Sequence, residues 1–251
     1  MYSRFFWHEF QSDQVEATQA FLTSLFPAWC QDMVSNPAGP YHMFAQDGLP
    51  WVGLRQRPDT WPAPHIRPYV CVADIENTAQ NIEASMGTIL DPIRTIPGQG
   101  RALTVQDPSG AVLSLMQSDT PAYQGRRPRG RGQAIWNELT TRDAAAIKPF
   151  YKSICGWDFE RAPTSHEYYY FGDDGLEDLG GVLPMVGEDW GTIPSHWMTY
   201  FEVENADAAV DQVKQLGGCI HVDPFSIADV GRLLVIGEPG GCLFTLFEPQ
   251  S

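Results

Sequence analysis

The stretch Trp136-Asn-Glu-Leu-Thr-Thr-Arg-Asp143 determines how this sequence is organised. It is followed by an alanine run, Phe150-Tyr151 and Gly156-Trp157, and an earlier version, Trp7-His-Glu-Phe-Gln-Ser-Asp13, opens the chain. Each copy has the pattern of a strand, an amphipathic helix and a turn. Four identities recur at a constant offset of 129 residues: Trp7 and Trp136, Glu9 and Glu138, Phe21 and Phe150, Ser24 and Ser153. The chain is therefore predicted to be a duplication.

A second pair of segments carries the same signal. Residues 65–116 align without a gap to residues 196–247, at an offset of 131, and 12 of the 52 pairs are identical. Glycine, proline and strand hydrophobics dominate those identities, as a shared backbone requires. We predict an α+β fold of four β-α-β-β-β units paired into two domains, residues 1–117 and 133–251, joined by a linker over residues 118–132.

The pattern also predicts individual elements. A strand over residues 4–11 precedes a helix that Asp13 caps and Pro27 ends, and the residues from there to Tyr41 are expected to form a loop. The expected helical stripe comprises Val15, Thr18, Phe21, Leu22 and Leu25. Tyr41–Gln46 and Trp51–Arg57 are expected to form a hairpin turned at Asp47-Gly48. Helix Ile75–Met86 should bury Ile75, Ala79, Ile82 and Met86 and stop at Gly87, whereas Pro149 predicts a kink or a late start in helix Asp143–Ile154.

Composition limits the classes of partner. The net charge is −15, which argues against nucleic acid and anionic membranes as partners. Four arginines gather at Arg126, Arg127, Arg129 and Arg131, either as a phosphate tether or, as we favour, in a solvated linker. Five scattered cysteines match reduced thiols better than disulfides or zinc. No apolar run is long enough for a membrane span or a signal peptide, so the cytoplasm is the expected location.

Three groups of residues carry a family resemblance: the Trp136–Trp157 stretch, His196-Trp with Tyr200-Phe-Glu-Val and Gly217-Gly218, and Ile227 to Gly241. With them the sequence resembles the vicinal oxygen chelate superfamily, also called the glyoxalase/bleomycin-resistance/dioxygenase fold, and within it the bacterial tandem two-domain proteins, many labelled lyases or hydroxylases. The resemblance implies that paired units form a curved sheet with a concave ligand cleft. It also implies a monomer or weak homodimer, since four units can satisfy their pairings within one chain.

Strand alternation assigns residues to the cleft side of each first strand. These are Trp7, Glu9 and Gln11; Arg67 and Tyr69; Trp136, Glu138 and Thr140; and Met198, Tyr200 and Glu202. By the resemblance, metal-using members place His, Gln or Glu ligands on the first and last strands of units. Here the first-strand positions hold Trp7, Arg67, Trp136 and Met198, and the last-strand positions hold Ser114 and Thr245. We therefore predict no metal site and no other cofactor.

Two glutamates are the leading functional candidates. Glu9 and Glu138, each beside a tryptophan, can act as a general acid or base, bind a ligand amine, or serve as structural carboxylates. Trp7, Trp136, Tyr69 and Tyr200 either line an aromatic slot or belong to the core. His65 and His196 either bind a ligand or, as we favour, bond nearby backbone at the start of a strand. Arg101 and Arg232 either pair with a cleft carboxylate, anchor an anionic substrate or, as we favour, form a salt bridge at a β-turn.

The function that follows is recognition of a small, partly aromatic or apolar molecule without a metal. Catalysis is left open. The alternative is a divalent-metal-dependent lyase, isomerase or dioxygenase using Glu9, Glu138, Glu202 and a histidine, and a third is a scaffold whose clefts are filled by its own side chains. The second domain keeps the repeated pattern more completely, so Trp136, Glu138 and Tyr200 are expected to contact the ligand while Trp7, Glu9 and Tyr69 hold structure.

Overall fold

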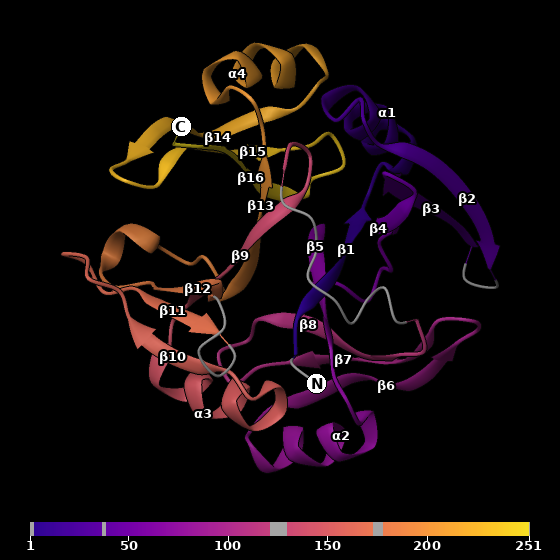
Figure 1. Cartoon of the computed structure of the whole chain (residues 1–251), viewed down its shortest axis with the longest axis vertical. Helices are drawn as coiled ribbons and strands as arrows, with labels where there is room; N and C mark the ends of the chain where they lie inside the picture. The colour runs from indigo at the N-terminus through magenta and orange to yellow at the C-terminus, as the bar shows by residue number, and fades with distance from the viewer. Residues whose placement is uncertain (1–2, 37–38, 121–129, 173–177, 251) are drawn as a thin grey trace. The chain divides into compact units, whose positions relative to one another are not determined.

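The computed structural model describes residues 3–36, 39–120, 130–172 and 178–250. Four β-α-β-β-β units follow one another along the chain (Figure 1). The first is β1 (Phe5–Ser12), α1 (Val15–Leu25), β2 (Cys30–Asn36), β3 (Gly39–Gln46) and β4 (Leu49–Gln56); the second is β5 (His65–Cys71), α2 (Ile75–Ala84), β6 (Thr88–Ile96), β7 (Gly100–Gln106) and β8 (Val112–Ser118). The third is β9 (Ala134–Thr141), α3 (Ala144–Cys155), β10 (Asp158–Arg161), β11 (Tyr169–Gly172) and β12 (Asp178–Pro184); the fourth is β13 (His196–Glu202), α4 (Ala206–Gln215), β14 (Cys219–Ile227), β15 (Gly231–Gly237) and β16 (Leu243–Pro249).

The strands form two sheets with the same topology. Their orders are β2-β3-β4-β1-β5-β8-β7-β6 and β10-β11-β12-β9-β13-β16-β15-β14. Each first strand pairs in parallel with the last strand of its own unit, and the remaining pairs within each unit are antiparallel. This confirms the predicted α+β fold and the duplication. Each sheet is drawn from one half of the sequence, while the exact domain boundaries remain a prediction.

The compact units are divided differently from the sheets. One unit contains α2 and α3 with β6 to β8 and β10 to β12, and the other contains α1 and α4 with β2 to β4 and β14 to β16. We call them the α2/α3 unit and the α1/α4 unit. Each therefore draws on both halves of the sequence. No helix in the described part of the chain is long and apolar enough to span a membrane.

In the core of the α2/α3 unit, the third β-α-β-β-β repeat contributes a group of aromatic side chains. Phe150, Tyr151, Trp157 and Phe171 are fully buried there. Trp157 stacks on Phe171 and donates a 2.8 Å hydrogen bond from Nε1 to the carbonyl of Ser3. The other members of this core include Val70, Ile82, Leu103, Leu115, Leu139, Ile147 and Val182.

The core of the α1/α4 unit includes the predicted stripe of α1. The five residues expected to face inward, Val15, Thr18, Phe21, Leu22 and Leu25, are the buried ones, which confirms that prediction. They pack with a ring cluster formed by Phe10, Trp29, Trp51, Phe201 and Phe244. The hairpin turned at Asp47-Gly48 is also confirmed, and both turn residues have a positive φ.

Two local predictions were wrong, and one of the two alternatives for helix α3 is excluded. Residues 30–36 form strand β2 rather than a loop; it is an edge strand, so its largely polar sequence lacks the alternation that marks a half-buried strand. Asp13 does not cap α1, because its carboxylate accepts a 2.6 Å bond from Arg57 while the hydroxyl of Ser12 accepts the N–H of Gln14. Helix α3 begins at Ala144 and continues through Pro149, which excludes the late start.

The end of α2 also differs from the prediction. The helix stops at Ala84, and Met86 takes the left-handed conformation at a φ of 64° with 71% of its surface exposed. Gly87 has no positive φ. Its N–H bonds the carbonyl of Ile82, and a side chain there would clash with the ring of Phe150. Glycine is needed at this position for close packing, not for its conformational freedom.

A buried carboxylate closes one loop in each unit. Asp107, in the turn before β8, accepts hydrogen bonds from the N–H groups of Ser109 and Ala111 and, at 2.9 Å, from the hydroxyl of Tyr151 on α3. Glu238 takes the matching position before β16, where it accepts from the N–H of Cys242 and the hydroxyl of Thr18 on α1. Burial raises the pKa of Asp107, while these hydrogen bonds oppose the rise.

Tyr151→Phe tests the loop contact of the α2/α3 unit. The variant removes a donor from a buried carboxylate, so the free energy of unfolding should fall by about 1–3 kcal/mol. Tyr169→Phe is the matched control, because Tyr169 donates a 2.6 Å bond to the exposed Glu167 and its loss should change stability little. Urea denaturation of both variants measures the difference, and equal losses would show that the Asp107 contact contributes nothing special.

Candidate functional site

A three-residue hydrogen-bond network links two of the predicted site residues in the second half. Trp136 and Glu138 are alternate residues of β9, so their side chains leave the same face of the strand. Tyr168, immediately before β11, lies between them: its hydroxyl accepts a 3.1 Å bond from Nε1 of Trp136 and donates a 2.9 Å bond to Oε2 of Glu138. Gly181 of β12 pairs in register with Glu138, and a side chain on it would clash with the phenol of Tyr168.

The first half contains the same network. The hydroxyl of Tyr41 on β3 accepts a 3.1 Å bond from Nε1 of Trp7 and donates a 2.8 Å bond to Oε2 of Glu9. Gly53 of β4 pairs in register with Glu9 and makes room for the phenol of Tyr41. Two copies of one arrangement thus occupy equivalent places in the two sheets, and each depends on a glycine in the neighbouring strand.

Sequence reasoning missed the two tyrosines and the two glycines. Tyr41 and Tyr168 are 127 residues apart, and Gly53 and Gly181 are 128 apart, because the loops within the repeats differ in length. Neither pair follows the constant offset of 129 that revealed Trp7 with Trp136. The available signal was a Trp-x-Glu strand followed at a similar distance in both halves by a tyrosine and then a glycine.

The first network has an additional cation. Nη2 of Arg67 lies 2.6 Å from Oε1 of Glu9, and both side chains are no more than 4% exposed. Gln11 also donates to Oε1 of this carboxylate. Burial alone would raise the pKa of Glu9, but the positive charge and hydrogen bond of Arg67 outweigh it and hold the pKa below its ordinary value. At the matching sequence positions the second half has Met198 in place of Arg67 and Thr140 in place of Gln11.

The two copies differ in burial. Trp7 is 7% exposed, whereas its counterpart Trp136 is only half-buried. Arg67 and Tyr69 are each 3% exposed, whereas Met198 and Tyr200 are half-buried. Trp7, Arg67 and Tyr69 are therefore enclosed by protein, whereas Trp136, Met198 and Tyr200 retain exposed surface; the two glutamates are both buried, and Tyr41 and Tyr168 are both half-buried.

Three half-buried rings contact one another in the α2/α3 unit, and one of them, Tyr168, bonds Glu138. We call them the aromatic cluster: Trp136, Tyr168 and Tyr170. Tyr170 meets Trp136 edge-on at 6.1 Å between ring centroids and Tyr168 edge-on at 5.6 Å. Burial, together with the nearby charge of Glu138, raises the pKa of Tyr168 far above its ordinary value. The phenol therefore stays protonated at neutral pH and keeps donating to the glutamate.

The remaining predicted residues make contacts of other kinds. Tyr69 packs edge-on against Phe6 and pairs in register with Ser114. Tyr200 pairs in register with Thr245. His65 and His196 each direct Nδ1 to a carbonyl two residues earlier, at 3.0 and 2.9 Å, which confirms the preferred interpretation of both. Burial lowers the pKa of both histidines, so both favour the neutral form.

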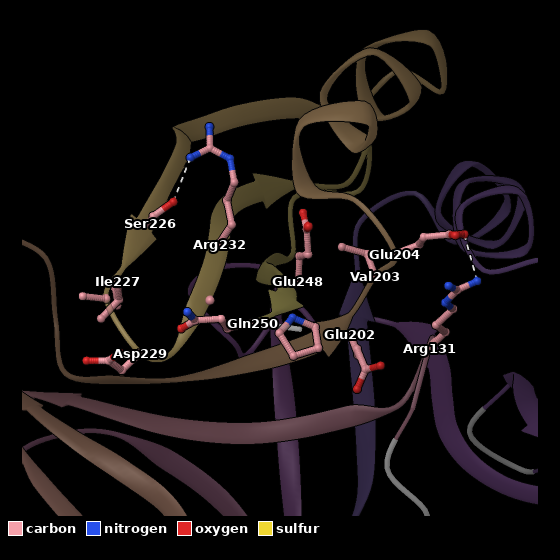
Figure 2. Close-up of a pocket in the computed structure, with 13 residues that line it drawn as sticks. Arg131, Glu202, Val203, Glu204, Ser226, Ile227, Asp229, Arg232, Glu248 and Gln250 are labelled. Atoms are coloured by element: carbon pink, nitrogen blue, oxygen red, sulfur yellow. Dashed lines mark hydrogen bonds and ion pairs between the residues drawn. The ribbon is translucent and has the colours of Figure 1, made fainter.

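Glu202 lines a groove of about 620 Å³ in the α1/α4 unit (Figure 2). The groove carries charges of both signs, and several of them are engaged within the protein. Arg131 forms a 2.8 Å ion pair with Glu204, both well exposed; Arg232 bonds Ser226 and Asp207; and Glu248 accepts the N–H of Ala206. Arg232 and, in the other unit, Arg101 do form ion pairs, but their partners Asp207 and Glu76 lie in the first turns of helices α4 and α2 rather than at a β-turn. Arg126, Arg127 and Arg129 lie outside the described residues.

The residues at the expected metal positions do not fit a divalent ion. Arg67 brings a positive charge, and both tryptophans use Nε1 as a hydrogen-bond donor. The hydroxyl of Ser114 lies 3.0 Å from that of Thr104, and Thr245 is likewise a neutral hydroxyl. Across the described ranges, no three His, Cys, Asp or Glu side chains are grouped so that they could hold a metal ion.

Two kinds of known protein resemble this chain over nearly its whole length: relatives in sequence and solved structures in fold. No family model matches the chain. It is 28% identical over 251 residues to the Mycobacterium tuberculosis protein named "Putative glyoxylase CFP32", covering 97% of this chain and 94% of that one. It is 27% identical over 267 residues to the anthracycline biosynthesis protein DauV of Streptomyces sp. strain C5, covering 96% of this chain and 92% of that one.

Solved structures share the fold over nearly the whole chain. The 2,3-dioxygenase LapB from Pseudomonas sp. KL28 matches with a TM-score of 0.66 at 14% identity, covering 99% of this chain and 92% of that one. The Mn(II)-bound glyoxalase from Novosphingobium aromaticivorans matches with a TM-score of 0.65 at 14% identity, covering 98% and 81%. These relatives and fold neighbours support the vicinal oxygen chelate superfamily that the sequence resembles. Within this superfamily its two-domain arrangement of repeated units also agrees with the resemblance seen in the sequence.

Proposed function

We propose that this protein binds a small, flat organic molecule against the aromatic cluster of Trp136, Tyr168 and Tyr170, with Glu138 as the polar contact and without a metal ion. The observation that carries the proposal is the unequal burial of the two tryptophans in the matching networks. Trp7 is 7% exposed, whereas Trp136 is only half-buried. The copy with accessible surface is the one able to meet a ligand.

The chemistry of the cluster suits an aromatic or apolar ligand. Ring pairs in edge-on or offset geometry contribute about 0.5–1.5 kcal/mol beyond the area that they bury. The hydrogen bonds from Trp136 to Tyr168 and from Tyr168 to Glu138 fix the orientation of the rings before a ligand arrives. Such preorganisation reduces the entropy lost on binding.

The first-half network is better suited to a structural role. Arg67, Gln11 and Tyr41 all direct hydrogen bonds to the carboxylate of Glu9, and these contacts lie inside the α1/α4 unit. A ligand would have to break a buried ion pair to reach that carboxylate, which is costly. We therefore assign recognition to Glu138 and Trp136 and structure to Glu9, Trp7 and Tyr69.

The relatives support a small-molecule role. DauV carries the name of an anthracycline biosynthesis protein, and anthracyclines are flat polycyclic compounds of the kind that the aromatic cluster would accept. The fold neighbours are named as a dioxygenase and a Mn(II)-bound glyoxalase, which favours the alternative of a metal-dependent lyase, isomerase or dioxygenase using Glu9, Glu138, Glu202 and a histidine. Metal analysis after dialysis separates the two, because a stoichiometric divalent ion would overturn the metal-free proposal.

Ligand binding should distinguish the two halves. We expect a thermal-shift screen of naphthalene and anthraquinone derivatives to yield a binder. The compounds should be neutral, because the net charge of −15 repels anions. Tyr168→Phe should weaken the affinity of the binder about tenfold, or about 1.4 kcal/mol, since it removes the two hydrogen bonds with Trp136 and Glu138 that orient the cluster. Tyr41→Phe, its counterpart in the other half, should leave the affinity unchanged.

Charge-neutral variants of the glutamates complete the test. Glu138→Gln should reduce binding measured by calorimetry, and Glu9→Gln should not. If Glu9→Gln abolishes binding while Glu138→Gln preserves it, the ligand site is in the first half. If both variants bind normally, neither network contacts the ligand. A cytoplasmic location and a monomeric or weakly dimeric state belong to the same proposal, and light scattering tests the latter.

A further inference from the structure

A cysteine and a histidine form a close pair on strand β14, the edge strand of the second sheet. Sγ of Cys219 lies 3.3 Å from Nε2 of His221, and both side chains are exposed. His221 lies at a register shift between Ile220 and Val222, and its imidazole lies on the same side of the strand as the thiol. Neither residue has an equivalent in the second unit, where the matching positions are Thr88 and Leu90.

The neighbouring strand leaves room for this pair. Gly237 of β15 pairs in register with Cys219. A side chain at Gly237 would come within 2.9 Å of Sγ and 3.0 Å of Nε2, so glycine is the residue that leaves both groups in place. The sulfur also lies 3.8 Å from the carbonyl of Gly237. The residue of the first half that matches Gly237 is Gln106, so the first half lacks this space as well as the pair.

The other cysteines provide a contrast within the same chain. Cys71, Cys155 and Cys242 are buried, and burial raises the pKa of each thiol. Cys30 is exposed, like Cys219, but among the described residues it has no imidazole within hydrogen-bonding distance. Cys30 and Cys219 are therefore both exposed, but only Cys219 has a histidine next to it among the described residues.

We propose that Cys219 is a nucleophilic thiol that reacts with small organic disulfides, with His221 as its base. Nε2 of His221 takes the thiol proton, and the Cys219 thiolate attacks one sulfur of the disulfide. The disulfide bond breaks, and a new bond forms between Sγ and the attacked sulfur. The other sulfur leaves with the electron pair and takes up a proton. Cys219 is oxidised to a mixed disulfide, and the reagent is reduced to one thiol, so the exchange needs no further oxidant.

Site-resolved kinetics test the proposal in the full chain. Dithiodipyridine, a neutral disulfide that releases a chromophoric thione, is the probe, and peptide mass spectrometry assigns each adduct. Cys219 should react roughly tenfold or more faster than Cys30, because His221 lies where it can take the thiol proton as the sulfur attacks. Cys219→Ser should remove the fast phase, and Cys30→Ser should retain it.

Two substitutions of the base separate chemistry from exposure. Because His221 lies on an exposed edge strand, the variants His221→Gln and His221→Ala should have the melting temperature of the native protein. In both, Cys219 should react only as fast as Cys30. Gly237→Ala should also slow the fast phase by displacing the pair. Equal rates at Cys219 and Cys30 in the native chain would overturn the proposal, and so would an unchanged rate in both His221 variants.

Discussion

Replacing Arg67 with methionine, the residue at the matching position of the second half, should lower the free energy of unfolding by about 3–5 kcal/mol. The guanidinium is 2.6 Å from the carboxylate of Glu9, and the two side chains are 3% and 4% exposed. Removing the cation leaves a buried negative charge without its ion-pair partner, and this desolvated charge, not the lost attraction, accounts for most of the effect. Urea denaturation at neutral pH measures it.

The surface provides the control. Arg101 pairs with Glu76, and those side chains are 38% and 51% exposed, so Arg101→Met should cost less than about 1 kcal/mol. The double variant Glu9→Gln/Arg67→Met should recover much of the stability that Arg67→Met loses, because it removes both charges. A loss in Arg67→Met no larger than that in Arg101→Met would show that Glu9 does not need its cation.

The same ion pair predicts a dependence on pH. The pKa of Glu9 is lowered in the folded protein from its ordinary value of 4.5. Its contribution to stability is therefore fully present above that value and is lost as the pH falls through the folded pKa. Stability measured from pH 5 downward should decline less steeply in Glu9→Gln than in the native protein, since the substituted amide does not titrate.

Expressing one half of the sequence alone should abolish folding. Residues 1–118 form a complete eight-stranded sheet, yet each compact unit takes part of its core from the other half. Without the second half, Gly87 loses the ring of Phe150, and Ser3 loses the indole of Trp157. The fragment should therefore lack a cooperative thermal transition, because a large share of its apolar surface has no partner.

Co-expression supplies the matching experiment. Residues 1–118 carrying an affinity tag and residues 133–251 without one should co-purify and melt cooperatively, because together they restore both cores. Thermal unfolding followed by circular dichroism and the dispersion of amide proton NMR signals are measured for each half alone and for the pair. A well-dispersed spectrum from residues 1–118 alone would instead show that each half is an independent folding domain.

Much of the fold could be predicted because the repeats constrain one another. The stripe of α1 follows from its helical period alone, since Phe21, Leu22 and Leu25 face the interior whatever their partners are. The partners could not be predicted, because a periodic pattern shows which face is buried but not what covers it. Met86 was misassigned for a related reason: it follows the period of α2 but lies beyond the residue where the helix ends.

The candidate site was predictable only in part. Glu9 and Glu138 were found because strand alternation places them beside a tryptophan on one face. Tyr41 and Tyr168 come from loops and strands whose lengths differ between the halves, so no constant spacing indicates them. The ion pair of Glu9 with Arg67 joins different repeat units. That contact depends on side-chain geometry across strands, which residue types and spacing do not determine.

Gly53 and Gly181 give the network a signature that can be searched for in other sequences. Any relative that places a tyrosine between the tryptophan and the glutamate needs a residue without a side chain at this position of the neighbouring strand. The intervals are 34 and 32 residues from tryptophan to tyrosine, and 12 and 13 from tyrosine to glycine. A Trp-x-Glu strand followed by tyrosine and glycine at these intervals would separate relatives that keep the network from those that share only the fold, even where overall identity is low.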